Sequence, residues 1–436
     1  MTSVKNKKTS ILGFLSKKIS LNDIYQWIDK IIYQKAFQNR MVIWTIILFF
    51  SVHFLINLAP LTRDWDIDSP SYYIAAKGVR EKINIYDEKQ FQNLADSIFG
   101  KSLIILPYIY TPILAQMIFF ISTVDYNQYF LIFLITNIIL TFACLYLIYY
   151  LLDLKKEKTK ITFLFLFALL FNNTPLIITI NYGQLNILVF FLILASLALD
   201  KKNKQFASSF LLVLSVLMKM YPALFLIYYA FKKRFKYIFY SIINCIIIFS
   251  ISSLCFGISY WVEFFKMSFQ SFLYGVKPVF FFDFNSYLDN NSLNSFLTQF
   301  FIKINVSRNL TAPIFLALLL LLLIIFWKNI KLFLKTECQN FYTSIILILC
   351  LILSTISWQH HYMIMMFPLA YLFKFIIVKR KYLYFLPFAL VFYFIQFYPR
   401  FGGFPFNQMR FIITCFSLFL IYFLYTSEKK LLDKPG

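Results

Sequence analysis

Long apolar segments alternate with short polar ones along almost the whole chain. Uncharged runs of roughly 18 or more residues recur, the first at 41–60, and each is long enough to cross a hydrocarbon core of about 30 Å. The alternating ten-residue strands that a membrane barrel requires do not stand out in the sequence. The pattern therefore predicts an all-α, polytopic integral membrane protein with about ten spanning helices.

Clusters of lysine and arginine between the apolar runs predict which loops face the cytosol, because cytosolic loops are enriched in these residues. Clear clusters lie at 155–160, 201–204 and 232–236. With these in the cytosol, residues 61–127 form a large first outer loop and residues 257–309 a second one. Within the first loop, 104–123 is short and broken by proline, so we expect it to be re-entrant or interfacial rather than a span.

Residues 206–231 are apolar but are interrupted by "MKMYP", which contains Lys219. Lysine clusters flank both ends of this segment, so we expect a helical hairpin that enters the membrane and returns, with Lys219 near its tip. Three regions follow from the whole pattern. They are a cytosolic amphipathic N-terminal segment at 1–40, a single transmembrane domain at 41–426 and a cytosolic tail at 427–436.

Composition and charge narrow the class further. Hydrophobic residues make up 60% of the 436-residue chain and charged residues 14%, whereas soluble domains are about 45–50% apolar and about 25% charged. The net charge of +23 stands in short clusters between apolar runs, which is typical of topology signals and disfavours a nucleic-acid partner. The six cysteines include no CxxC pair, so neither a disulfide framework nor a zinc site is indicated.

Under this topology, the unusual polar residues all emerge on the outer face. They are Asp66, Asp68, Tyr110, Gln184, Asn186, Lys219, Asn291, His360, His361 and Arg400. A solvated rim does not need so many separate polar stretches, so the arrangement predicts a site at the outer membrane–water boundary, open to lipid.

Several of these residues also have a purely structural interpretation. Asp68 precedes Ser69 and Pro70 and fits the start of a helix, a role that is compatible with catalysis. Gln184 and Asn186 fit either a polar turn or contacts with sugar hydroxyls. A lysine within an apolar segment costs roughly 2.5–3.5 kcal/mol on insertion scales. Lys219 is therefore either a snorkelling side chain at the hairpin tip or a counter-charge for a phosphate.

The remaining candidates are similarly open. His360 and His361 are either structural or donors to a phosphate. Metal binding by them is disfavoured, because adjacent helical side chains point about 100° apart. Arg400 fits an outer-face anchor or a phosphate clamp. Asn291 and its neighbour Ser292 precede an apolar run, where a helix cap is the default interpretation.

Several motifs occur in an order that resembles glycosyltransferase family 87. They are "DSPSYYIAA", "NIYD", "YIYTP", "GQLN", "KMYP", "NNSLN" and "SWQHHY". The resemblance runs from about residue 40 to residue 426 and implies the C-type glycosyltransferase fold. It also implies transfer of a sugar, typically mannose, from polyprenyl-phosphate-mannose to an acceptor outside the membrane.

The resemblance places the family's catalytic base on Asp68. Two departures stand out: Thr111-Pro112 replaces a pair of prolines, and Asp66 adds an Asp-x-Asp pair. Asp66 is the second candidate for the base. We expect no cofactor and no divalent metal, because two carboxylates are few ligands for an ion that prefers six.

The expected enzyme is an inverting hexosyltransferase of the plasma membrane whose site faces outside. Its partners are membrane lipids, the polyprenyl-phosphate-linked sugar and a glycolipid or glycan acceptor. Lys219, His360, His361 and Arg400 are expected to bind the donor phosphate, and Tyr110, Gln184, Asn186 and Asn291 the sugar or acceptor. The alternative is a lipid or polysaccharide transporter, which would place its polar residues at mid-membrane, or a non-catalytic scaffold.

Overall fold

A computed structural model of the protein describes most of the chain after residue 67. The described residues are 26, 68–100, 105–154, 165–166, 168–170, 173–271, 290–307, 310–325, 338–379, 381–397 and 404–432. Within these ranges the chain is helical and forms no strand. Four predicted features lie outside the described residues. They are the N-terminal segment apart from Gln26, the first span at 41–60, Asp66 and Arg400.

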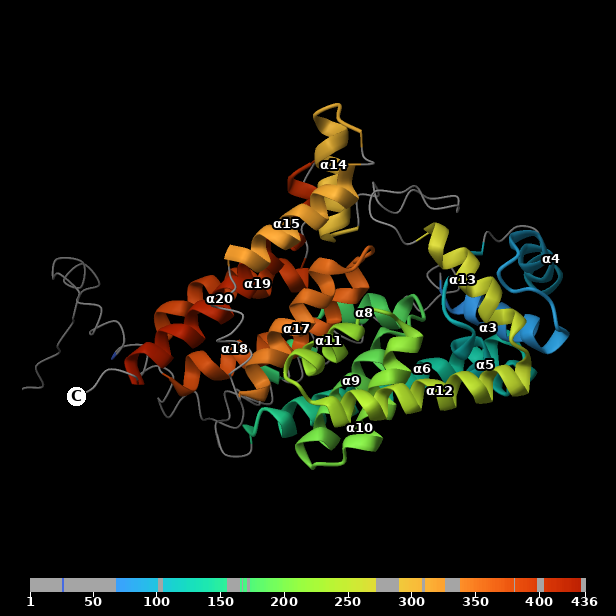
Figure 1. Ribbon diagram of the computed structural model, residues 1–436, viewed down its shortest axis with the longest axis horizontal. Coiled ribbons are helices and arrows are strands. Elements are labelled where there is room, and N and C mark those ends of the chain that lie inside the picture. The colour runs from blue at the N-terminus through green and yellow to red at the C-terminus, as the bar shows by residue number, and fades with distance from the viewer. Residues whose placement is uncertain are drawn as a thin grey trace, which may run out of the picture.

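The described part of the predicted first outer loop forms a group of short helices at one end of the molecule (Figure 1). They are α3 (Ser69–Glu81), α4 (Glu88–Phe99), α5 (Pro112–Ile118) and the 3₁₀ turn η3 (Ile121–Thr123). The helix α4 begins at Asp87, whose carboxylate accepts the Gln90 N–H at 2.9 Å. Because α5 has only 7 residues, it is far shorter than the roughly 20 residues that cross a bilayer.

Four helical segments of the described chain are long and apolar enough to cross a membrane. They are α6 (Tyr126–Leu151), α12 (Phe235–Phe256), η6 with α18 (Gln359–Met365 and Met366–Val378), and η8 with most of α20 (Phe406–Gln408 and Met409–Leu432). A fifth results if α8 (Thr174–Asn181) and α9 (Asn186–Lys201), which meet at 119°, form one broken span. The described part of the chain is therefore all-helical and contains helices typical of a membrane protein, whereas the count of about ten spans stays a prediction.

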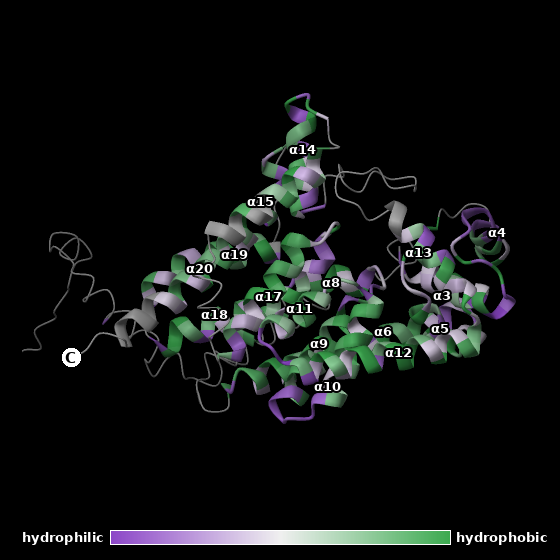
Figure 2. Ribbon diagram, viewed as in Figure 1, coloured by the Kyte–Doolittle hydropathy of each residue, from purple (hydrophilic) through white to green (hydrophobic). Residues whose placement is uncertain are grey.

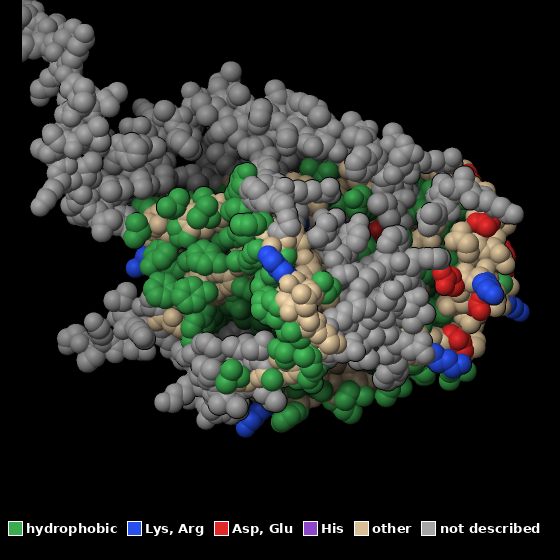
Figure 3. Space-filling model, turned by 90° about the horizontal axis from the view of Figure 1, so that it is seen from above, with side chains coloured by type: hydrophobic (Ala, Val, Ile, Leu, Met, Phe, Trp, Pro, Cys, Tyr) green, Lys and Arg blue, Asp and Glu red, His purple; other side chains and the backbone are tan. Residues whose placement is uncertain are grey.

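The surfaces of α6 and α12 expose many large apolar side chains, as a lipid-facing surface requires. They include Leu131, Ile135, Ile139 and Phe142 on α6 and Phe239, Ile242, Ile246 and Leu254 on α12. Apolar residues dominate these helices in Figure 2, and hydrophilic ones gather on α4 and at helix ends. In Figure 3, charged side chains gather at the end of the molecule that holds α4, and apolar side chains cover much of the remaining described surface.

The expected hairpin consists of α10 (Gln205–Met218) and α11 (Ala223–Phe231), which are separated by a break at Lys219. The far ends of both helices lie on one side of the molecule. Lys204, before α10, and Lys236, after α11, line the same hollow. Arg234 also follows α11, and it forms two bonds of 2.6 Å with Asp200 at the end of α9. The chain thus runs to Lys219 and returns.

The C-terminal half supplies the other wall of the core. Its remaining helices are α13 (Ser259–Ser271), α14 (Leu293–Lys303), α15 (Thr311–Ile325), α17 (Gln339–Leu353), η7 (Tyr382–Tyr384) and α19 (Phe385–Phe397). The η6 turn packs against both α8 and α17. This packing brings the histidine pair next to the turn between α8 and α9. The contact is direct, since Thr179 Oγ1 donates to the His360 carbonyl at 3.0 Å although the two residues are 181 positions apart in the chain.

Candidate functional site

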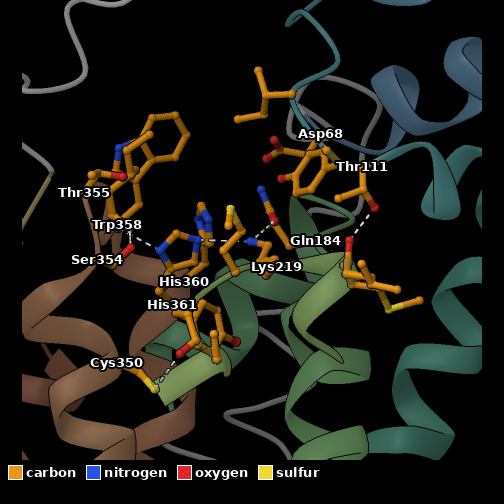
Figure 4. A pocket seen from close by; sticks show the side chains of 18 of the residues that line it. Asp68, Thr111, Gln184, Lys219, Cys350, Ser354, Thr355, Trp358, His360 and His361 are labelled. Atoms are coloured by element: carbon orange, nitrogen blue, oxygen red, sulfur yellow. Dashed lines mark hydrogen bonds between the residues drawn. The ribbon is translucent and has the colours of Figure 1, made fainter. Parts of the chain in front are cut away.

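A cavity of about 500 Å³ lies where the outer-loop helices meet the α8–α9 and α10–α11 turns and the segment before η6. Its polar lining consists of Asp68, Ser71, Tyr110, Thr111, Gln184, Lys219, Tyr221, Ser354, Thr355, Trp358, His360 and His361. Figure 4 shows Lys219 and Gln184 between Asp68 on one side and the two histidines on the other. Six of the ten predicted site residues therefore line one cavity: Asp68, Tyr110, Gln184, Lys219, His360 and His361.

Asp68 occupies the N-cap position of α3, so the predicted helix start is confirmed. Its side chain, however, makes no capping hydrogen bond. The backbone of Asp68 is already near-helical, at φ −103° and ψ −34°, whereas a capping residue is usually extended. Its N–H instead donates to the Tyr182 carbonyl at 3.1 Å. The carboxylate faces the cavity, and its Oδ2 has no hydrogen-bond partner among the described residues.

The surroundings of Asp68 tune its basicity. Burial raises the pKa of this carboxyl to about 6, and the Gln184 side chain and the charge of Lys219 act in the opposite direction. The group is therefore mostly ionised at neutral pH and remains a better proton acceptor than an exposed aspartate. A buried carboxylate oxygen that lacks a partner is suited to accept a proton from a substrate hydroxyl.

Lys219 is held by side chains from two other parts of the chain. Its Nζ lies 2.6 Å from Asn186 Oδ1, 3.3 Å from Gln184 Oε1 and 3.1 Å from His361 Nε2. It also lies 5.6 Å from the centre of the Tyr110 ring. The side chain reaches into a polar cage that opens on the cavity. A snorkelling side chain would instead extend towards the membrane surface.

The two histidines lie on the η6 turn with their ring centres 4.6 Å apart and their planes at 86°. His361 accepts the Trp358 backbone N–H on Nδ1 at 3.2 Å. His360 is buried, and its carbonyl accepts from Thr179. Both adjacent side chains nevertheless line the same cavity.

Asn291 and Asn186 lie one layer behind the cavity wall. The Asn291 N–H donates to the Ser357 carbonyl at 2.8 Å. Its neighbours Asn290, Ser292 and Asn294 donate to the Thr355 carbonyl at 3.2, 3.1 and 3.1 Å. Ser292 also caps α14, as expected of this segment, by accepting the Ser295 N–H. We name residues 290–294 the asparagine clamp; it fixes the segment that leads to Trp358 and the histidines. The sugar contacts expected of Asn291 and Asn186 stay predictions.

Three lining or supporting residues were not predicted as site residues. The hydroxyl of Tyr72 lies 3.1 Å from that of Tyr110 and 3.2 Å from Gln184 Oε1. The Thr111 hydroxyl donates to the Leu217 carbonyl, which joins the first outer loop to α10. Trp358 lines the cavity beside the histidines. The sequence held two signals: all three residues lie in motifs of the family resemblance, and Tyr72 lies four residues after Asp68, which is about one helical turn.

The described residues contain no group of three or more His, Cys, Asp or Glu side chains placed to hold a metal ion. Asp66, the other half of the Asp-x-Asp pair, is outside these residues, and Arg400 is outside them as well.

The family model for glycosyltransferase family 87 matches residues 108–355, more than half of the chain. The chain belongs to glycosyltransferase family 87. It is therefore a membrane glycosyltransferase, as the motif order predicted. No curated protein matches the chain.

The matched region of this glycosyltransferase contains Tyr110, Gln184, Asn186 and Lys219, and it ends within the segment that the asparagine clamp holds. Asp68 lies before it and the histidines after it. Because both join the matched residues around one cavity, the glycosyltransferase has a proton acceptor and a set of nitrogen groups on opposite sides of the same space. That combination suits activation of a hydroxyl and stabilisation of a departing anion.

Proposed function

We propose that this glycosyltransferase moves a hexose, with mannose as the first choice, from a polyprenyl-phosphate-sugar to a lipid or glycan acceptor. The observation that carries the proposal is the relation of Asp68 to the other wall of the cavity. Its Oδ2 has no partner among the described residues and faces a cavity that Lys219, His360 and His361 also line. A sugar phosphate with an acceptor hydroxyl needs a base on one side and groups that bind phosphate on the other.

The reaction is a single displacement at the anomeric carbon. The acceptor hydroxyl attacks this carbon while the Asp68 carboxylate takes the hydroxyl proton. The bond between the anomeric carbon and the phosphate oxygen breaks, and its electron pair leaves with the polyprenyl phosphate. Lys219 and His361 face the departing phosphate and stabilise its charge. One displacement from the opposite side inverts the anomeric configuration.

The rest of the cavity provides contacts for both parts of the donor. Gln184 and Tyr110 offer polar edges to sugar hydroxyls. Apolar residues of the α10–α11 region line the cavity from Leu217 to Ile227, and Met220 and Ile227 are exposed at its edge. This edge gives an isoprenoid chain a path from the lipid to the polar end.

We propose that the site faces outside in the plasma membrane, and the geometry of α10 supports this orientation. Lys204 and Lys236 lie at the far end of α10 from Lys219. The helix has 14 residues, which corresponds to roughly 21 Å at 1.5 Å per residue. With the lysine-rich end in the cytosol, the cavity lies towards the outer face.

The test uses purified protein in detergent with radiolabelled polyprenyl-phosphate-mannose and a total membrane lipid extract. We expect a labelled lipid product from the wild type and a loss of roughly 10²- to 10⁴-fold in Asp68→Asn, because a general base contributes about this factor. Asp87→Asn is the matched control, since Asp87 caps α4 outside the cavity and asparagine also caps helices. Absence of donor turnover in the wild type would overturn the donor class, and a product with retained configuration would overturn the single displacement.

A further inference from the structure

The hydrogen-bond partners of Lys219 Nζ restrict whether this group is an ammonium or a neutral amine. Three polar atoms surround Nζ: the side-chain oxygens of Asn186 and Gln184 and the Nε2 of His361. The two oxygens only accept hydrogen bonds, whereas a histidine nitrogen donates or accepts according to its tautomer. The direction of the Lys219–His361 contact therefore depends on the other nitrogen of the His361 ring.

That other nitrogen, Nδ1, accepts the backbone N–H of Trp358 at 3.2 Å. A backbone N–H is always a donor, so Nδ1 carries no proton. A neutral imidazole holds one N–H, which the Trp358 contact places on Nε2, although the Ile356 carbonyl also hydrogen-bonds with the protonated ring. The Nε2–H bond then points at Lys219 Nζ, 3.1 Å away.

An ammonium group has three donors and no acceptor, so it cannot receive this hydrogen bond. A neutral amine fits all three contacts, because it donates to the two carboxamide oxygens and accepts from His361 on its lone pair. We propose that Lys219 is a neutral amine while the cavity is empty and takes up one proton from solvent when the donor phosphate binds. The second half of this inference rests on the proposed function, which supplies the phosphate.

The groups that face Lys219 are consistent with this state. They come from every element around it: Asp68 and Tyr72 of α3, Tyr110 of the loop before α5, Gln184 and Asn186 of the α8–α9 turn, Tyr221 of the α10–α11 turn, Cys350 of α17, and His360 and His361 of η6. Lys219 lies between α10 and α11, outside the helices long enough to span the membrane. Burial lowers its pKa to about 7, although the charge of Asp68 acts in the opposite direction.

Proton uptake would rearrange the site in favour of the donor. Once Lys219 is an ammonium, its contact with His361 becomes one between two donors and is lost. The ammonium turns into the cavity, where the phosphate is, and the Nε2–H of His361 becomes free to donate as well. The phosphate thus gains both a charge partner and a second hydrogen-bond donor from one protonation event.

The experiment is isothermal titration calorimetry with a short-chain polyprenyl-phosphate-mannose and no acceptor, at pH 8 in buffers that differ in ionisation enthalpy. The donor is a phosphodiester and does not titrate near this pH, so the slope of the observed heat against the buffer enthalpy counts protons bound by the protein. We expect a slope of about one proton for the wild type, and an affinity that falls about tenfold per pH unit above pH 8. We expect a slope near zero for Lys219→Arg, because arginine is always charged.

The outcomes distinguish a failure of the neutral-lysine inference from a failure of the proposed function. Binding by the wild type with a slope of zero overturns the neutral lysine and leaves the proposed donor intact. A slope of one in both proteins assigns the proton to another group and also overturns it. No binding heat at any pH overturns the donor class and the proposed function with it. If Lys219→Arg does not fold, the pH dependence of wild-type affinity decides, and a constant affinity between pH 8 and 9.5 contradicts the inference.

Discussion

The Nζ of Lys219, just beyond the end of α10, lies 2.6 Å from the Oδ1 of Asn186, at the start of α9. These residues are 33 positions apart, and each was predicted to be functional on separate grounds. Their contact gives them different tasks: Lys219 faces the cavity, and Asn186 holds it from behind. Asn186 was interpreted as part of a polar turn or as a contact for sugar hydroxyls. Its bond to Lys219 adds a third role, which is to position that side chain.

Replacing Asn186 with leucine should therefore weaken donor binding more than it slows turnover. The variant removes the acceptor of one hydrogen bond at a buried position, with little change in volume. We expect KM for the donor to rise roughly 3- to 10-fold, the range of one hydrogen bond. Steady-state kinetics with varied donor measure this effect.

Asn186→Asp is the informative companion variant. A carboxylate at this position would sit beside Nζ and keep Lys219 protonated, so proton uptake on donor binding should fall towards zero. A loss of kcat with unchanged KM in Asn186→Leu would contradict the positioning role.

The pH dependence of turnover should report the ionisation of Asp68. The raised pKa of about 6 means that the carboxylate is protonated below this value and cannot accept a proton. We expect kcat at saturating donor to fall about tenfold per pH unit below the pKa that Asp68 has in the donor complex, which the ammonium of Lys219 holds below the value of the empty cavity, and to level off above it. Saturating donor removes the contribution of Lys219 to binding. An acid limb of the same size in Asp68→Asn would assign the base to another group.

The local features of this site were predictable, whereas their assembly was not. The helix start at Asp68 and the break at Lys219 follow from Pro70 and from a charge in an apolar run. The place of Asp68 beside the α8–α9 turn depends on a tertiary bond from its N–H to the Tyr182 carbonyl. No local pattern contains that bond, so the sequence predicted the N-cap position of Asp68 but not that its carboxylate would face the cavity without a capping bond.

The asparagine clamp also depends on tertiary contacts that the local sequence does not predict. "NNSLN" was predicted as a helix cap, and Ser292 does cap α14. Its bond to the Thr355 carbonyl spans 63 positions and depends on how α14 packs beside the end of α17. Short-range chemistry predicted the cap, and only the packed helices reveal what the clamp holds.

Ser292 gives the clamp a direct test. Ser292→Ala removes both the cap of α14 and one donor to Thr355. We expect unfolding in detergent to require roughly 1–2 kcal/mol less free energy, and kcat to fall because Trp358 and the histidines lose their support. Ser292→Thr keeps the hydroxyl and should restore both. If Ser292→Ala unfolds more easily but keeps its full kcat, the clamp supports only the fold.

The pair Asp200–Arg234 should stabilise the return of the hairpin far more than an exposed pair does. Both guanidinium contacts are 2.6 Å long; the Arg234 side chain is 29% exposed, but the Asp200 side chain that it neutralises is only 6% exposed. In the comparable pair Lys201–Asp153, the side chains are 31% and 48% exposed. Removing one partner of a buried pair leaves an unpaired charge and costs about 3–5 kcal/mol, whereas an exposed pair contributes less than about 1 kcal/mol.

We therefore expect Arg234→Met to lower the free energy of unfolding in detergent by roughly 3 kcal/mol and Lys201→Met by less than about 1 kcal/mol. Thermal unfolding of the two variants side by side measures the difference. Because α11 leads from Lys219 to Arg234, the Arg234 variant should also bind the donor less tightly at temperatures where it is still folded. Equal stability of the two variants would mean that the packing of α10 and α11 alone holds Lys219 at the cavity.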